Sequence, residues 1–194
     1  MEYFKLCHKC QNGTFIDGDV SFQPEISGYY QNGTTLLPEE VKVSVVLDKS
    51  LEDIGADFFM TSVGAFFVSK NLKEVIENFQ SNLRLVKAEV SYHNGYPTIR
   101  EYYLIHAVNQ VYCFDYIESE YSGKGLILEK IRKKELQEGY QIRGVKKLSI
   151  DKSKAGGDDI FFIGGVIWLD PIVSRALANE ILLRDLNVRC SVIV

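Results

Sequence analysis

The sequence lacks a long hydrophobic run, although 46% of its 194 residues are hydrophobic. Its longest uncharged apolar stretch runs from Ile160 to Leu169 and is interrupted by Gly164-Gly165. That stretch is well short of the ~20 apolar residues that a membrane-spanning helix needs. The first ten residues also lack the apolar centre of a signal peptide. We therefore expect a cytoplasmic globular protein that does not act at a membrane.

A second close pair of cysteines, which a zinc site would need, is also missing. The four cysteines are Cys7, Cys10, Cys113 and Cys190, and without a secretion signal they are expected to be free thiols. Cys7 and Cys10 have the spacing of half a zinc knuckle, but no second close pair exists to supply the other two ligands. We expect no metal and no cofactor.

The motifs of common catalytic sites are absent as well. The sequence has no nucleophile elbow, phosphate-binding loop, dinucleotide-binding glycine fingerprint or pair of zinc-binding histidines. His106 and Cys113 come nearest to a Cys-His pair, but their odd separation places them on opposite faces of a regular strand unless it breaks at Asn109. Two carboxylate pairs lie beside glycines: Asp17 with Asp19, and Asp158 with Asp159. Such runs are typical of turns, so we expect no catalytic residues.

A net charge of −4 conceals an uneven distribution. Residues 124–154 hold ten Lys or Arg against four Asp or Glu, a net charge of +6, which leaves −10 for the rest of the chain. The basic stretch lacks the interleaved aromatic residues of a protein that binds single-stranded nucleic acid. We therefore expect no nucleic-acid partner. The acidic remainder would attract a basic protein, because the summed field of many charges accelerates association.

The order of turn and strand signals predicts an α+β fold. Residues 1–45 form a turn-rich and strand-rich segment, and residues 46–194 form one domain, which divides into two similar halves at 57–120 and 121–194. The asparagine–glycine turn signals of the first segment favour tight hairpins. The fold class is therefore expected to be a mostly antiparallel sheet with two strand-helix-strand units.

The two units are predicted from the same succession of patterns. Phe66–Val90 shows an apolar strand, a helix cap at Ser69 or Asn71, an amphipathic helix and an alternating strand. Val166–Val194 repeats this order, with a helix that is expected to begin at Asp170-Pro171, since Asp favours the cap and Pro the first helical position.

Several segments follow one another in an order that resembles a known family. They are Asp57–Met60 and Phe66–Ile76, then Tyr102–Asn109, then Cys113–Tyr121. In this order they resemble the bacterial immunity-protein family of polymorphic toxin systems typified by a myxobacterial protein. The similarity spans about residues 45–194. The sequence departs from that pattern at 141–144, where an aromatic-Arg step is expected, and at Asp170-Pro171, where Ser-Glu is expected.

The resemblance implies a non-enzymatic cytoplasmic protein that binds the C-terminal toxic domain of a cognate toxin. An acidic and aromatic segment is the candidate contact surface, since tyrosines serve as anchors and charges as a rim. Its residues are Asp115, Tyr116, Glu118, Glu120 and Tyr121. If the toxin is a nuclease, these acids would imitate the phosphates of its substrate. In the alternative interpretation the tyrosines pack internally and the acids are merely solvated.

Two other classes of function stay open from the residues alone. One is a small enzyme that uses His106 with Cys113, or a carboxylate pair. The other is a structural or oligomer-forming module, of which a homodimer held by a two-fold apolar interface is the simplest form.

Overall fold

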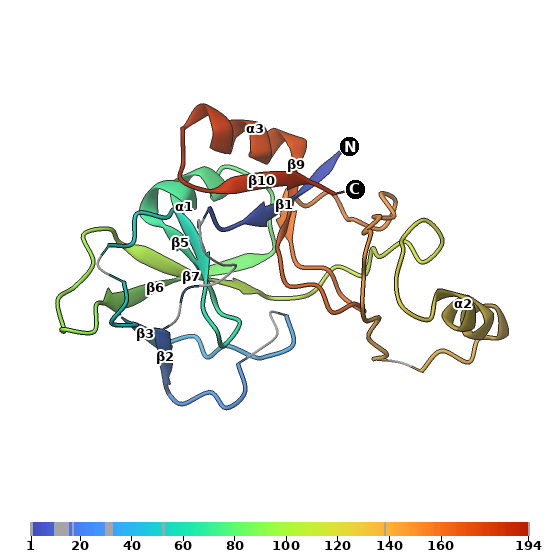
Figure 1. The fold of residues 1–194 in the computed structure, drawn as a ribbon, viewed down its shortest axis with the longest axis horizontal. Helices are drawn as coiled ribbons and strands as arrows, with labels where there is room; N and C mark the ends of the chain where they lie inside the picture. The colour runs from blue at the N-terminus through green and yellow to red at the C-terminus, as the bar shows by residue number, and fades with distance from the viewer. Residues whose placement is uncertain are drawn as a thin grey trace.

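A computed structural model describes residues 2–9, 16, 18–29, 33–51, 53–137 and 139–193. Within these residues the chain forms ten strands and three helices (Figure 1). In chain order they are β1 (Tyr3–Cys7), β2 (Gly18–Gln23), β3 (Lys42–Leu47), β4 (Phe58–Met60), β5 (Phe66–Ser69), α1 (Lys70–Ile76), β6 (Leu83–Ser91), β7 (Tyr102–Ala107), α2 (Lys124–Lys133), β8 (Ile160–Phe161), β9 (Ile172–Ser174), α3 (Arg175–Leu183) and β10 (Arg189–Val192).

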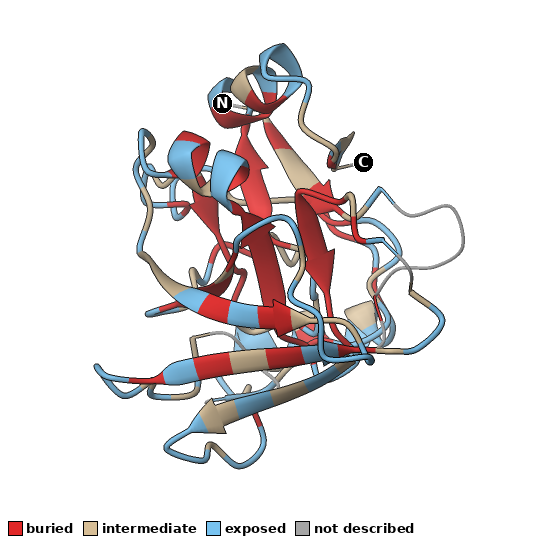
Figure 2. Cartoon of the chain, turned by 90° about the vertical axis from the view of Figure 1, so that its left-hand side faces the viewer, coloured by how far each residue is buried: buried red, intermediate tan, exposed pale blue. Residues whose placement is uncertain are grey.

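The strands form two sheets. The larger has the order β2-β3-β6-β7-β5-β4, and the smaller has the order β10-β1-β9-β8. Neighbouring strands are antiparallel except β3 and β6, which are parallel. In the larger sheet β4, β5 and β7 are buried along almost their whole length, β6 is mostly half-buried, and β2 and β3 alternate buried or half-buried with exposed residues (Figure 2). The predicted α+β class with a mostly antiparallel sheet is therefore confirmed.

Two strand-helix-strand units repeat within these sheets, as the sequence predicts. The first unit is β4-β5-α1-β6 and the second is β8-β9-α3-β10. In the larger sheet β7 lies between β5 and β6, and in the smaller sheet β1 lies between β9 and β10 in the same way. The N-terminal strand of the chain thus completes the C-terminal unit. Residues 10–15 and 17, which carry most of the predicted early turns, lie outside the described residues.

A serine begins the helix of each unit. The Ser69 hydroxyl accepts a hydrogen bond from the backbone N–H of Leu72 at 3.3 Å, and the Ser174 hydroxyl accepts one from Leu177 at 3.2 Å. Each bond satisfies one of the N–H groups that the first turn of a helix leaves unpaired. The predicted start of the second helix at Asp170-Pro171 is therefore wrong. The residues after Pro171 form β9 instead, because they pair with β1 on one side and β8 on the other.

An aspartate ties each unit to the other. The first is Asp57: its Oδ1 accepts from the Ser69 hydroxyl at 2.5 Å, and its Oδ2 accepts from the backbone N–H of Asn187, after α3, at 2.6 Å. The second is Asp159, whose Oδ1 accepts from the Ser174 hydroxyl at 2.5 Å and whose Oδ2 accepts from the backbone N–H of Gln80, after α1, at 3.2 Å.

The backbones beside these carboxylates are also bonded reciprocally. Asp57 donates its N–H to the Asn187 carbonyl at 3.1 Å, and Asp159 donates its own to the Gln80 carbonyl at 2.7 Å. Each aspartate thus connects the helix cap of its own unit to the segment that follows the other unit's helix. We call these two arrangements the aspartate clamps.

The two units share one hydrophobic core. Helices α1 and α3 lie beside each other on the same side of the sheets (Figure 1). Their buried residues belong to one cluster with the inward side chains of both sheets. From the helices these are Leu72, Val75 and Ile76, with Leu177, Ala178 and Ile181. Both units therefore fold as one body, because each helix buries its apolar face in the same core.

The chain between β7 and β8, residues 108–158, forms a distal lobe. It extends away from the body on the side opposite to β2 and β3 (Figure 1). Apart from α2, its described residues are turns, coil and isolated bridges. A separate cluster, which includes Cys113, Phe114, Tyr121 and Ile127, packs this lobe against the smaller sheet through Tyr3 and Ile172. The lobe is thus attached by side-chain packing more than by a shared sheet.

Candidate partner-binding surface

Asp115, the first residue of the predicted contact segment, has a structural role in the distal lobe. Its Oδ1 accepts hydrogen bonds from the backbone N–H groups of Ile117 at 2.9 Å and Glu118 at 3.0 Å. Its own backbone N–H bonds to the carbonyl of Ser149 at 3.0 Å. This is a typical aspartate-stabilised turn, so the carboxylate holds the shape of the segment.

The two tyrosines of the segment point toward the core of the lobe. The side chain of Tyr121 is buried, and its hydroxyl donates to the carbonyl of Tyr116 at 3.1 Å. The rings of Tyr121 and Tyr116 both stand edge-on to the ring of Phe114, at centroid distances of 5.4 Å for Tyr121 and 5.1 Å for Tyr116. Burial raises the pKa of both phenols. The structure therefore brings Tyr116 and Tyr121 together internally, with Tyr116 half-buried and partly accessible.

Glu118 and Glu120 are exposed, and their neighbours are basic. The backbone carbonyl of Glu120 accepts from the N–H groups of Lys146 at 2.8 Å and Lys147 at 3.2 Å. The ammonium of Lys124 donates to the carbonyl of Ser119 at 2.9 Å. The two carboxylates are therefore set among lysines, which the sequence did not reveal because Lys146 and Lys147 are more than 20 residues away. Their role in binding stays a prediction.

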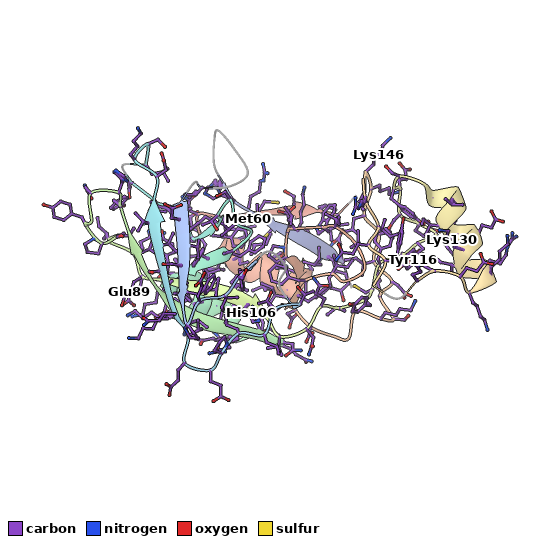
Figure 3. All side chains as sticks on the ribbon, turned by 90° about the horizontal axis from the view of Figure 1, so that it is seen from below. Met60, Glu89, His106, Tyr116, Lys130 and Lys146 are labelled. Atoms are coloured by element: carbon purple, nitrogen blue, oxygen red, sulfur yellow. The ribbon has the colours of Figure 1, made fainter. Side chains whose placement is uncertain are left out.

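A basic surface occupies the end of the distal lobe. Helix α2 begins after Gly123, whose φ of 73° is left-handed and easily adopted by glycine. The segment 143–147 lies against the residues that precede the helix, because Ser122 donates to the carbonyls of Arg143 and Gly144 at 3.3 Å. We call six cations of α2, of its C-cap and of this segment the basic tip; Lys124, which donates to the carbonyl of Ser119, and Lys133, which pairs with Glu129, are not part of it. The six cations are Lys130, Arg132, Lys134, Arg143, Lys146 and Lys147. Lys130 and Lys146 lie at the same end of the molecule in Figure 3.

Aliphatic side chains lie exposed in the same lobe. Helix α2 buries Ile127 but leaves Leu126 60% exposed and Ile131 36% exposed. Ile117, in the turn that Asp115 holds, is 69% exposed. Apolar groups among charges are the composition of a protein–protein contact surface. The charge of this region was evident from the sequence, but the exposure of these apolar side chains was not.

The candidate catalytic pair is not brought together. His106 is buried, and its Nδ1 lies 3.0 Å from the hydroxyl of Tyr29. Burial lowers the pKa of His106, and the charge of Arg84 lowers it further. Cys113 belongs to the core cluster of the distal lobe, where burial raises the pKa of its thiol to about 12. Such a thiol is protonated at neutral pH, and the thiolate is the nucleophilic form.

The carboxylate pairs and the metal candidates give no site among the described residues. Asp159 is engaged in its clamp, and Asp17 and Cys10 lie outside the described residues. In the part of the chain that the structure describes, no three His, Cys, Asp or Glu residues come together as metal ligands. None of the described helices has the length and apolar character to cross a membrane.

One comparison with known proteins identifies the family. The model of the immunity protein family Imm11 matches residues 13–187. The match begins earlier than the resemblance at residue 45 suggested, so it takes in most of the N-terminal segment. No curated protein matches the chain. Since the match covers most of the sequence, the chain belongs to the Imm11 immunity protein family.

Proposed function

We propose that this protein neutralises a cognate bacterial toxin in the cytoplasm by binding the toxin's C-terminal domain. The observation that carries the proposal is the family match over residues 13–187. Immunity proteins of this kind are typically non-enzymatic. The protein then acts by occupying a surface that the toxin needs, and its own side chains perform no chemical transformation.

The structure supports a binding role through its rigidity. A protein that holds its contact surface in shape before the partner arrives loses less conformational entropy on binding. The aspartate clamps and the shared core fix the two units relative to each other. Asp115 fixes the turn that carries Ile117 and Glu118. The contact surface is thus prepared in the free protein.

Co-expression tests this proposal directly. The toxin gene beside this one is expressed in a bacterial host with and without this chain, and growth is scored. We expect rescue of growth, together with a stable complex between the purified chain and an inactive toxin domain. A toxin that stays inactive after the complex is separated under denaturing conditions and refolded would instead indicate a covalent modification by an enzyme.

The segment 115–121 is proposed as one part of the contact surface. Its exposed residues are Ile117, Glu118 and Glu120, and Tyr116 is half-buried. Against a nuclease toxin with a basic substrate groove, the two carboxylates would form favourable pairs. The variant Glu118→Lys/Glu120→Lys is expected to weaken toxin binding by roughly 10-fold. An unchanged dissociation constant would show that the two acids are merely solvated.

A further inference from the structure

Charge in this protein is separated in space as well as in sequence. The stretch 124–154 carries +6; the whole distal lobe, residues 108–158, carries +2, and the residues outside the lobe carry −6. The distal lobe that holds this stretch lies at one end of the long axis (Figure 1), and Glu89 lies at the opposite end from Lys130 and Lys146 (Figure 3). A molecule with such a charge separation orients itself in the field of an approaching charged partner.

The cations of the basic tip have no ion-pair partner among the residues that the structure describes. Elsewhere in the stretch, Lys133 pairs with Glu129 at 2.7 Å and Lys154 pairs with Asp151 at 2.9 Å. All six cations of the basic tip except the half-buried Lys130 are exposed. Their charge is therefore available to a partner.

The backbone holds the two halves of the basic tip together. The N–H of Lys146 bonds to the carbonyl of Glu120 at 2.8 Å, and the next residues lead through Ser122 into α2. A side chain at Gly144, where φ is 61°, would come within 2.3 Å of the Ser122 hydroxyl. The close approach of these two segments thus depends on glycine. The backbone that carries the two halves of the basic tip therefore has a fixed arrangement.

The side chains among these cations favour a protein as the partner. Leu126 and Ile117 are aliphatic and exposed, and they cannot stack on nucleic-acid bases as aromatic rings do. An extended polyanion would also meet the net charge of −6 that the residues outside the lobe carry. A folded partner with a local acidic and apolar patch can cover the aliphatic side chains, and it need not approach the acidic remainder of the molecule.

We infer that the basic tip, with Leu126 and Ile117, docks onto an acidic and partly apolar surface of the cognate toxin domain. This inference rests on the proposed function and names the larger part of the contact surface. Glu118 and Glu120 lie at its border, where they meet cations at the edge of the toxin's acidic patch. Such a mosaic of charges fixes the register of a complex and excludes wrong partners.

Two double variants with the same change in net charge test the inference. Lys146→Glu/Lys147→Glu reverses charge on the basic tip. Lys42→Glu/Lys49→Glu reverses two exposed lysines outside the distal lobe. Association with the inactive toxin domain is measured at several salt concentrations, after denaturant unfolding has shown that both variants are folded. The first variant is expected to bind roughly 100-fold more weakly with a shallower salt dependence, and the second no more than a few-fold more weakly.

A second pair of variants tests the apolar part. Leu126→Ala removes an exposed leucine from the lobe, and Leu182→Ala removes one that is 79% exposed on α3. We expect roughly 10-fold weaker binding for the first, since it lies in the contact, and no change for the second.

The outcomes separate this inference from the proposed function. If the wild-type chain neither binds nor neutralises the toxin, the proposed function fails. If the wild-type chain binds but the basic-tip variants bind equally well, or if both double variants weaken binding equally, the inference is overturned. It is overturned also if the wild type binds single-stranded RNA or anionic vesicles, the basic-tip variant loses that binding, and toxin affinity stays the same.

Discussion

The paired units and the distal lobe use charge in opposite ways. In the units, the carboxylate of Asp57 is buried and accepts three hydrogen bonds, one of them from Arg100 at 2.7 Å. In the lobe, Lys146 and Lys147 are exposed and unpaired in the described structure. A buried charge must have its partners inside the protein because desolvation is costly, whereas an exposed charge can keep its partner for binding. We therefore expect substitutions in the units to affect stability most and substitutions in the lobe to affect toxin binding most.

The largest loss in the free energy of unfolding is expected at the aspartate clamps. Asp57→Asn removes the charge that faces Arg100 and replaces an acceptor by an N–H₂ donor. We expect a loss of about 3 kcal/mol in the free energy of unfolding, the low end for a broken buried ion pair because Arg100 is 41% exposed. Denaturant unfolding measures the loss.

Asp159→Asn is the matched control for that variant. Its carboxylate is only half-buried and has no arginine partner within the described residues. The expected loss is about 1–2 kcal/mol, since two hydrogen bonds to a charged group are weakened and not an ion pair. Equal losses at the two positions would show that Arg100 contributes nothing to the first clamp.

Replacing a leucine of the body and one of the lobe is expected to give a smaller difference in the free energy of unfolding. Leu177→Ala leaves a cavity between α3 and the sheets and is expected to lower the free energy of unfolding by about 2–3 kcal/mol. Leu126→Ala removes an exposed side chain and is expected to change it by less than about 0.5 kcal/mol. Thermal and denaturant unfolding check both values. A large loss for Leu126→Ala would contradict a role for this leucine in binding alone.

The smallest effect concerns the pH dependence of stability and a buried histidine of the body. His106 has a pKa below its ordinary value because it is buried near Arg84. The unfolded chain then takes up a proton that the folded protein resists, so stability falls as pH falls below about 6.5. We expect His106→Gln to reduce the difference in unfolding free energy between pH 7.5 and pH 5.5. A difference as large as in the wild type would assign the pH dependence to other groups.

The local part of the fold could be predicted from short patterns. The cap at Ser69 was one of two candidates, with Asn71, and both could be named because the side chain, the helix and its apolar spacing are all close in sequence; the structure places the cap at Ser69. The same logic failed at Asp170-Pro171, where the cap is Ser174. Proline also suits the start of a strand. The segment after Pro171 forms a strand and not a helix because it pairs with β1, which lies more than 160 residues away. Pairing between distant strands leaves no local signal.

At the candidate surface, too, some features could be predicted from the sequence and others could not. The +6 charge of residues 124–154 was evident from a count. The burial of Tyr121 and the basic surroundings of Glu118 and Glu120 were not, because they depend on packing between segments 116–122 and 143–149. Spacing along a coil-rich segment does not indicate which side chains face the core.

The sequence by itself determined the two units, their helices and the separation of charge, since these depend on residue type and on neighbours within a few positions. Only the tertiary structure decided that an N-terminal strand completes the C-terminal unit, and that Asp57 and Asp159 each hold the segment after the other unit's helix. It also decided which charges stayed exposed. These features require distant segments to meet, and such contacts form only when the whole apolar core is buried at once.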